Sequence, residues 1–307
     1  LITSTPNSDE DQFAMIWKEA LKTEDEFGNP NPSGQGRNGF AAYKCHWSEH
    51  PDRDEDWARD ERSRIGEERF RREHECEFLI YDETLISSLV LADMEGVAPV
   101  ETTGQVRWFK RPTPGMTYMV SLDPSMGTGG DYAAIQVFEL PTFEQIGEWH
   151  HNQTPMNQQV RILQGINKHI HDTIMEKDTT ATPEIFYSME HNTIGEAALL
   201  RVMDIGEENI EGMFLSEPIR KGHRRKFRRG FNTTAKHKID ACTKFKELVE
   251  NGKLEINSKL LISELKDFVA TGMSYKAKPG QHDDLVSSCL LMTRMTVSYT
   301  HLRAHET

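Results

Sequence analysis

Two short apolar runs that each end in a carboxylate constrain this sequence more than any other feature. Residues 117–122 lead into Asp123, and residues 184–189 lead into Glu190. Short apolar runs bounded by turn-forming residues are typical of buried strands. In an open α/β sheet, ligands lie outside the carboxyl ends of the strands. We therefore expect the two carboxylates to lie close together, although they are far apart along the chain.

The segments around these runs alternate between strand and helix patterns. Two further strands are predicted at 133–140 and 142–149, joined by a tight turn at Pro141 and Thr142. Apolar residues recur at helical spacing in several other segments. The helices predicted in this way cover residues 156–176, 194–203, 236–251, 259–269 and 283–295. A strand meander followed by alternating helices and strands predicts an α/β fold, with a mixed sheet and helices on its faces.

The first part of the chain has a mostly helical and highly charged pattern. A helix is predicted to begin at about Asp9, a loop covers residues 25–39, and a charged helical stretch covers residues 54–77. Residues 96–115 are rich in Gly and Pro, which is typical of a linker. Because 307 residues exceed what one hydrophobic core usually organises, we expect two domains with their boundary in this linker.

A third acidic element, Asp283 and Asp284, opens the last predicted helix. The N-terminus of that helix can project its carboxylates toward the strand ends that carry Asp123 and Glu190. Clustered carboxylates repel one another and need divalent cations, and oxygen ligands suit Mg²⁺ or Mn²⁺. Two such ions about 3.5 to 4 Å apart can activate a water molecule and stabilise the leaving 3′ oxygen of a phosphodiester. The predicted chemistry is hydrolytic strand cleavage.

Each of these carboxylates also has a structural explanation when it is taken alone. Asp123 precedes Pro124 and a glycine-rich loop, so it fits a turn. Asp283 fits a helix N-cap, Asp284 fits a favourable charge in the first helical turn, and Glu190 fits a cap of the following helix. The joint pattern is far less expected by accident than any one of its members, and it favours the metal site.

A basic segment stands out against a formal net charge of −13, which argues against nonspecific nucleic-acid binding through the whole surface. Phe227 is interleaved in this segment, and Gly222 and Gly230 bracket the basic run. A loop of this kind fits phosphate contacts, with a merely solvated loop as the alternative. The candidate DNA-binding residues are Arg220, Lys221, Arg224, Arg225, Lys226, Arg228 and Arg229.

Several stretches match, in order and separation, the pattern of one known family. They are Ser121-Leu122-Asp123-Pro124 with Gly130-Asp131-Tyr132, Glu190-His191-Asn192-Thr193-Ile194-Gly195, Gly230-Phe231-Asn232-Thr233-Thr234 and His282-Asp283-Asp284-Leu285-Val286. Over roughly residues 115–296 the chain resembles the nuclease domain of the large terminase subunits of tailed bacteriophages, in particular the T4-like type. The resemblance implies a ribonuclease H-like endonuclease that cuts concatemeric double-stranded DNA to begin and end its packaging.

The resemblance also implies roles for single residues. Asp123, Glu190 and one of Asp283 and Asp284 match the family's acidic triad, and Asp284 is preferred because it directly precedes the apolar run. Asp131 matches a nearby acidic position and joins the candidate metal ligands, with turn formation as its alternative role. These residues imply a site for two Mg²⁺ or Mn²⁺ ions.

Upstream, Thr3-Ser4-Thr5-Pro6-Asn7 resembles the coupling motif at a strand end of the family's packaging ATPase. Residues 1–100 are then the C-terminal remnant of that P-loop ATPase domain, 101–114 the linker and 115–297 the nuclease domain. Residues 298–307 fit nothing in the family and resemble a translated sequencing-library adapter, so we expect an unrelated tail.

The phosphate-binding pattern G-x-x-x-x-G-K-[ST] is absent from the sequence. We therefore expect no ATPase activity from this chain and expect ATP to bind only the full-length protein. Because the chain starts at Leu1 rather than Met, we expect a fragment of a longer protein. The resemblance implies double-stranded DNA, the portal protein and the small terminase subunit as partners, and a motor oligomer for the full-length protein.

Location and thiol chemistry are constrained by what the sequence lacks. No stretch reaches the roughly 18 apolar residues of a membrane helix, and the start lacks the layout of a signal peptide. With the resemblance, this predicts a protein of the host cytoplasm that does not bind a membrane. Its scattered cysteines favour neither a zinc ribbon nor a disulfide framework; they are Cys45, Cys76, Cys242 and Cys289.

Two alternatives stay open at this point. The same carboxylate geometry serves other ribonuclease H-like nucleases, such as a Holliday-junction resolvase or an integrase core, although the motif at residues 3–7 favours a terminase. The other alternative is a non-catalytic module that binds DNA or the portal protein, in which the acidic residues are only caps and turns.

Overall fold

The computed structural model describes residues 1–5, 12–24, 31–77, 83–217 and 229–306. Contacts divide the chain into two compact units, Leu1–Glu83 and Thr84–Thr307. The contacts therefore place the boundary between Glu83 and Thr84, upstream of the Gly- and Pro-rich stretch at 96–115 in which it was predicted. Among the described residues, no helix is both long and apolar enough to cross a membrane.

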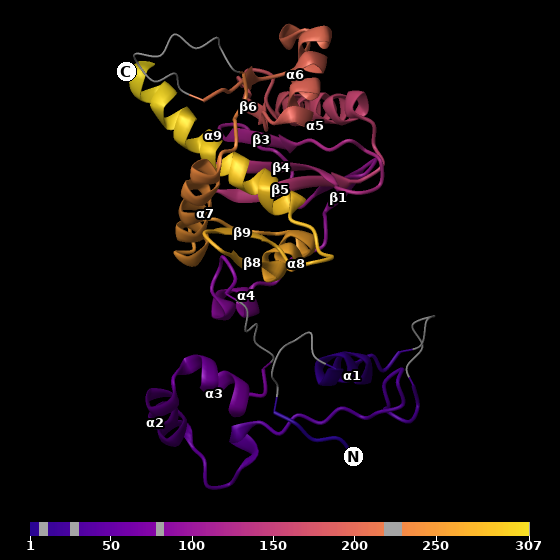
Figure 1. The fold of residues 1–307 in the computed structure, drawn as a ribbon, viewed down its shortest axis with the longest axis vertical. Coiled ribbons are helices and arrows are strands. Elements are labelled where there is room, and N and C mark those ends of the chain that lie inside the picture. Colours follow the sequence, from indigo (N-terminus) through magenta and orange to yellow (C-terminus); the bar gives the residue numbers. More distant parts are fainter. Residues whose placement is uncertain (6–11, 25–30, 78–82, 218–228, 307) are drawn as a thin grey trace. The chain divides into compact units, whose positions relative to one another are not determined.

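The first unit consists of short helices joined by irregular segments (Figure 1). Its helices are α1 (Gln12–Leu21), the 3-10 helix η1 (Trp47–Glu49), α2 (Glu55–Ile65) and α3 (Glu67–Glu73). A small core of Trp47, Ala58 and Phe70 holds α2 and α3 together. The charged helical stretch predicted over 54–77 is confirmed, while Asp9 lies outside the described residues. The assignment of this unit to an ATPase domain stays a prediction.

The second unit is built on a mixed sheet whose seven strands have the order β1-β2-β5-β4-β3-β6-β7. The strands are β1 (Glu101–Thr103), β2 (Val106–Trp108), β3 (Thr117–Asp123), β4 (Ala133–Leu140), β5 (Glu144–His151), β6 (Glu184–Met189) and β7 (Met213–Phe214). β3, β4 and β5 form the predicted antiparallel meander. β6 runs parallel to both β3 and β7. The predicted mixed α/β sheet is thereby confirmed.

Residues 101–114, predicted as a linker, instead contribute two strands to the sheet. β1 and β2 form a hairpin around Gly104, and β2 pairs with β5. Gly147 of β5 permits this pairing, because a Cβ there would lie only 2.8 Å from a ring carbon of the buried Trp108. Gly104 thus marks a tight turn within the sheet rather than a connection between domains.

The prediction also missed a two-stranded hairpin, β8 (Phe268–Thr271) with β9 (Ser274–Ala277). The helix predicted over 259–269 ends earlier, as α8 (Lys259–Asp267). Phe268 and Val269 continue the helical spacing of apolar residues, but both pair with β9 in an extended conformation. Apolar spacing alone does not separate the end of a helix from the start of a strand.

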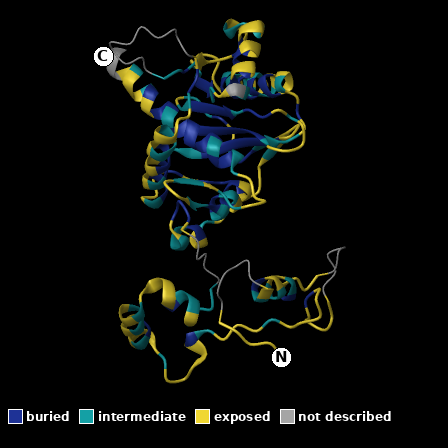
Figure 2. Cartoon of the chain, viewed as in Figure 1, coloured by how far each residue is buried: buried dark blue, intermediate teal, exposed yellow. Residues whose placement is uncertain are grey.

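Helices cover both faces of the seven-stranded sheet (Figure 1). One face packs against α5 (Met156–Lys177) and α6 (Thr193–Ile205) through an apolar core that includes Val120, Leu122 and Leu163. The other face carries α9 (Asp284–Glu306), flanked by α7 (Ala235–Glu250) and α8. The strands between these layers are the most deeply buried part of the unit (Figure 2).

α9 continues well past residue 297, where the nuclease domain was predicted to end. Its last turns contact the sheet domain, because Arg303 forms an ion pair with Glu184 at the start of β6. The origin of residues 298–307 as an unrelated tail stays a prediction. A helix is compatible with either origin, since an appended segment can extend a helix that precedes it.

α9 is fixed to β3 by a pair of buried serines. The Ser121 hydroxyl donates to the Ser288 carbonyl over 2.8 Å, and the Ser288 hydroxyl donates to the Ser121 carbonyl over 2.9 Å. Both side chains are fully buried. These reciprocal bonds set the position of the helix along the strand, and therefore the position of its N-terminus.

Replacing Ser288 by Val should lower the free energy of unfolding by about 1–3 kcal/mol, because it removes a buried donor and adds a larger side chain at a fully buried position. Urea titration followed by circular dichroism measures this. Ser287→Val, on the less buried neighbouring position, is the matched control and should change stability by at most about 0.5 kcal/mol. Equal losses in the two variants would show that the serine pair has no special role.

Candidate active site

Strands β3 and β6 bring the first two predicted carboxylates together. The strands are parallel neighbours in which Leu122 pairs with Met189. The Glu190 amide donates to the Leu122 carbonyl over 3.1 Å, so the ladder continues to the residues that follow. Asp123 and Glu190 therefore lie at the carboxyl ends of adjacent strands, as the sequence predicted.

The N-terminus of α9 supplies the third carboxylate. Asp284 is its first residue, one helical turn before the serine that is bonded to β3. The Tyr132 amide donates to the Asp284 carboxylate over 3.4 Å. Tyr132 directly precedes β4, in which Ala134 pairs with Asp123. Two independent connections, through β3 and through β4, thus hold Asp284 at the same strand ends.

Burial and mutual repulsion dominate the electrostatics of these carboxylates. The pKa of Asp123 is raised well above its ordinary value, first by burial and then by the charges of Glu190 and Asp284 and a hydrogen bond to Glu190. Burial also raises the pKa of Asp284 to about 6, against the opposing hydrogen bond from Tyr132, with further contributions from Asp283 and Asp131. Raised pKa values in two neighbouring acids are typical of functional sites.

Asp283 and Asp284 have different surroundings. Asp283 accepts a hydrogen bond from the Ala277 amide of β9 over 3.3 Å and has the Lys238 ammonium 3.8 Å away. Its charge is therefore already partly compensated. Asp284 is 15% exposed and faces Tyr132 and His282 instead. This difference favours Asp284 over Asp283 as a cation ligand.

Asp131 lies in the exposed loop between β3 and β4, and its charge reaches Asp284. The loop is anchored on its inner side by buried Gln159, whose amide nitrogen donates to the Ser125 carbonyl over 2.9 Å. Further along, the Gly129 amide donates to the Asn152 carbonyl over 2.9 Å. Asp131 thus stands next to the carboxylate group on a loop that is held at two points.

The donor set fits hard divalent cations. It consists of carboxylate oxygens, which suit Mg²⁺ and Mn²⁺, and the charges of Glu190 and Asp284 raise the pKa of Asp123, as uncompensated like charges do. In the part of the chain that the structure describes, no group of three or more His, Cys, Asp and Glu side chains is arranged so that it could hold a metal ion. Mg²⁺ usually keeps several water ligands and is held by few protein carboxylates.

Sequence reasoning missed a second layer of residues around Asp284. Tyr132 stacks on His150 with ring centroids 4.1 Å apart, and burial lowers the pKa of His150 to about 4. Glu264 of α8 lies 3.7 Å from His150 and accepts a hydrogen bond from the Val286 amide over 3.1 Å. Burial raises the pKa of Glu264 to about 9. Both side chains are therefore neutral near pH 7, and Glu264 supports the first turn of α9 directly.

The structure describes only some of the other predicted site residues. Of the basic segment, Arg220, Lys221, Arg224, Arg225, Lys226 and Arg228 lie outside the described residues. Arg229 is described and forms an ion pair with Glu207. In the proposed coupling motif, Thr3, Ser4 and Thr5 lie in an irregular segment of the first unit, and Pro6 and Asn7 lie outside the described residues.

Comparison with known proteins places residues 120–295 in the family described as the terminase ribonuclease H-like domain. Similar solved structures include the large terminase nuclease from the thermophilic phage G20c with bound magnesium, at 19% identity and a TM-score of 0.51 over 69% of this chain and 96% of that one. The same nuclease with bound cobalt gives 19% identity and a TM-score of 0.50 over 69% and 96%. A further structure of it gives 18%, 0.50, 71% and 98%.

These similarities confirm the predicted ribonuclease H-like fold and the predicted terminase family. The match covers the strands and helices that carry Asp123, Glu190 and Asp284. The descriptions of the matches do not specify the T4-like type, and that part of the resemblance stays a prediction.

The raised pKa of Asp284 predicts that, in buffer with a chelator, the free energy of unfolding falls as the pH rises. The ordinary pKa of 3.8 applies to the unfolded chain and about 6 to the folded one, so stability falls as the pH rises through this interval. Asp284→Asn lacks this loss and should exceed the wild type by up to about 3 kcal/mol at pH 7, at about 1.4 kcal/mol per pKa unit. Urea titrations between pH 4.5 and pH 8 measure the difference.

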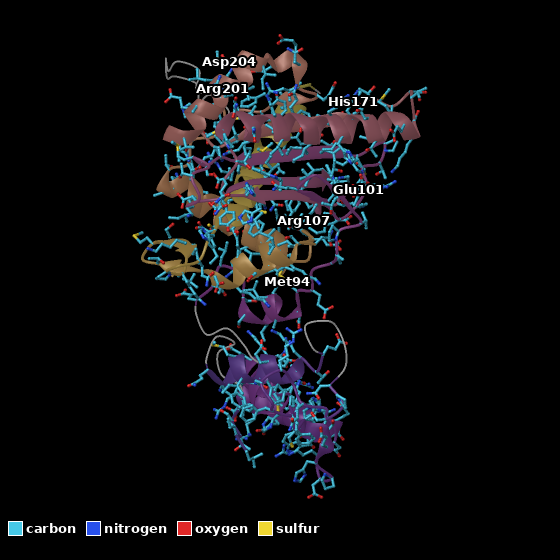
Figure 3. All side chains as sticks on the ribbon, turned by 90° about the vertical axis from the view of Figure 1, so that its right-hand side faces the viewer. Met94, Glu101, Arg107, His171, Arg201 and Asp204 are labelled. Carbon is cyan, nitrogen blue, oxygen red and sulfur yellow. The ribbon has the colours of Figure 1, made fainter. Side chains whose placement is uncertain are left out.

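The matched control for this experiment is Asp204→Asn on α6, where the carboxylate is exposed and pairs with Arg201 (Figure 3). Its stability difference from the wild type should not grow with pH over the same interval. A difference between Asp284→Asn and the wild type that is constant with pH would contradict the proposed burial of an ionising carboxylate.

Proposed function

This chain belongs to the terminase ribonuclease H-like family, and from that premise we propose that it is a divalent-metal-dependent DNA endonuclease. Its substrate is double-stranded DNA, which it cuts as a concatemer during phage genome packaging. The observation that carries the proposal is the convergence of Asp123, Glu190 and Asp284 from two strand ends and one helix N-terminus. Metal-bound structures of a terminase nuclease with the same fold support the use of divalent ions.

Asp123, Glu190 and Asp284 are the proposed ligands, with Asp131 as a further candidate and Asp283 as a structural neighbour. Two divalent ions, when bound, supply the positive charge that activates a water molecule and stabilises the leaving 3′ oxygen. Asp123 is central to the set, since the charges of both Glu190 and Asp284 raise its pKa. The carboxylates must be ionised to act as ligands, so protons compete with the metal at Asp284, whose pKa without the ion is raised to about 6, and the metal concentration needed for cleavage should rise below that pH.

The rigid frame around the carboxylates gives them fixed directions before substrate binds. Tyr132 orients Asp284 through its backbone amide, while Asn192 donates to the Glu190 carboxylate over 2.6 Å. The Asn192 side chain also accepts from the Gly195 amide over 2.8 Å and so caps α6. Outer contacts of this kind orient ligands and raise metal affinity.

The remaining parts of the proposal follow from family membership. We propose that residues 1–100 are the end of a packaging ATPase domain and that ATP acts only on the full-length protein. The portal protein and the small terminase subunit are proposed partners of the full-length motor oligomer in the host cytoplasm. The basic segment at 220–229 is proposed to contact DNA.

Purified protein should nick or linearise plasmid DNA with Mn²⁺ or Mg²⁺ and stop when EDTA is added. Asp123→Ala should lower the cleavage rate by about 100-fold or more, because it removes the central ligand. Gel electrophoresis of the products measures the rate, and circular dichroism checks the fold. Asp204→Ala, an aspartate removed from the site, is the control and should cleave like the wild type. Cleavage that persists in EDTA would overturn the proposal.

The choice of substrate separates this function from the related nucleases. Linear duplex, branched junction and RNA–DNA hybrid of equal length should be compared at one Mn²⁺ concentration. The terminase function predicts cleavage of the linear duplex without a preference for the branch. Selective cleavage of the junction would indicate a resolvase, and binding of DNA without cleavage of any substrate would indicate a non-catalytic module.

The two adjacent aspartates should differ in their effect on cleavage. Asp284→Asn should reduce the rate about as strongly as Asp123→Ala, whereas Asp283→Asn should reduce it by about tenfold or less, as expected of a residue outside the ligand set. The reason is that Lys238 and the Ala277 amide already engage Asp283. Single-turnover rates at saturating Mn²⁺ measure the difference. The reverse order would assign the metal to Asp283.

A further inference from the structure

Arg294 of α9 is a largely buried arginine whose guanidinium contacts several protein groups, among them His237, 3.4 Å away. Its side chain is 12% exposed. It forms an ion pair with Glu217, donates to the Asn232 carbonyl over 3.1 Å and donates to the Thr233 hydroxyl over 3.1 Å. The guanidinium carbon also lies 5.2 Å from the centre of the Phe231 ring. A planar group with several fixed donors can hold three such partners at once.

These partners stand on the two sides of the segment 218–228. Glu217 precedes that segment, and Phe231, Asn232 and Thr233 follow it. The Glu217 amide also donates to the Gly230 carbonyl over 3.3 Å. The Arg294 side chain therefore joins Glu217, on the N-terminal side of residues 218–228, to Asn232 and Thr233 on their C-terminal side.

Phe231, which follows this segment, pairs with the chain at the end of β6, next to Glu190. The Phe231 amide donates to the Met189 carbonyl over 3.2 Å, and the His191 amide donates to the Phe231 carbonyl over 2.7 Å. Gly230 allows this approach, because a Cβ there would lie 2.8 Å from the Met189 carbonyl oxygen. Glu190 is thus held between β3 on one side and Phe231 on the other.

This arrangement gives residues 230–234 a role in supporting the site. Residues 230–234 contribute no carboxylate, yet they extend the sheet beside Glu190 by one bridge. A single bridge at a sheet edge is weak by itself. Phe231 is nevertheless 1% exposed, packed under the Arg294 guanidinium. The arginine is the contact that ties this bridge to α9, the helix that begins with Asp284.

We propose that Arg294 is a positioning residue that clamps Phe231, Asn232 and Thr233 against α9 and thereby fixes Glu190 relative to Asp284. The expected effect of Arg294 on metal binding rests on the proposed function. The clamp on the backbone of residues 231–233 does not depend on a metal. Arg294 acts through Phe231 rather than on the substrate, since both terminal nitrogens of its guanidinium bond to protein groups. Its loss should loosen the Glu190 strand end while leaving Asp123 in place on β3.

The first test measures amide hydrogen exchange by NMR in Arg294→Met and in Arg294→Lys. The protection of the Phe231 and His191 amides should fall by at least about tenfold in Arg294→Met, as expected when a local contact is lost. Arg294→Lys keeps the charge but cannot hold all three partners, so its loss should be smaller. Protection of β3 and β4 amides should not change. Unchanged protection at Phe231 and His191 would overturn the proposal, whatever the metal does.

The matched control is Arg303→Met on the same helix. Arg303 also pairs with a glutamate, Glu184, and lies over an aromatic ring, Tyr299, but it is 47% exposed. Its removal should leave the Phe231 and His191 amides protected. An equal loss of protection in Arg303→Met would mean that any disturbance of α9 loosens the strand end, and this also would overturn a specific clamp.

The second test measures Mn²⁺ binding by isothermal titration calorimetry together with cleavage. Arg294→Met should weaken Mn²⁺ binding and raise the Mn²⁺ concentration for half-maximal cleavage by about 10- to 100-fold, the range seen when a ligand loses its support. Arg294→Lys should recover part of this loss, and the KM for DNA should not change. Wild-type binding in Arg294→Met would overturn the role in the site. Absence of Mn²⁺ binding in the wild type would instead refute the proposed function and leave hydrogen exchange to decide the clamp.

Discussion

Repulsion between partly buried carboxylates is the constraint on which the rest of this structure depends. Asp123, Glu190 and Asp284 are drawn from separate elements to one edge of the sheet, where burial and like charge raise the pKa of Asp123 and Asp284. Such a group costs folding energy whenever it is ionised without a compensating cation. The surrounding fold must therefore hold the carboxylates in place against that cost, and a divalent ion that neutralises them gains affinity from it.

The fold meets this demand by fixing each carboxylate from two directions. β3 and β6 are joined by a parallel ladder that continues into Glu190. α9 is bonded to β3 through Ser121 and Ser288, and its first residue is bonded to the backbone before β4. Neutral Glu264 supports the first turn of α9 without adding to the repulsion, since its pKa is raised to about 9. The ribonuclease H-like sheet and its helices thus hold in place carboxylates that repel one another.

The sequence contained enough to predict the central part of this arrangement. Apolar runs that end at Asp123 and Glu190 mark buried strands, and the rule for open sheets places their ends together. Other parts depend on contacts that have no local signal. Gly104 permits a hairpin, and Gly147 permits its pairing with β5, where Gly and Pro predicted a linker. Glu264 belongs to an amphipathic helix pattern and gives no sign of burial, and Arg294 meets partners that are distant in the sequence. Long-range packing, rather than propensity, decides such positions.

The account can be tested most directly by a crystal structure of this chain soaked in Mn²⁺, with anomalous scattering used to locate the ions. It predicts manganese peaks at the ends of β3 and β6, within about 2.0 to 2.3 Å of oxygens of Asp123 and of Glu190 or Asp284, by the usual range for such ions with oxygen ligands. Crystals soaked in millimolar Mn²⁺ that show no manganese peak there would contradict the account. So would a structure in which the Asp123 and Glu190 carboxylates lie too far apart to bind one metal ion or two neighbouring metal ions.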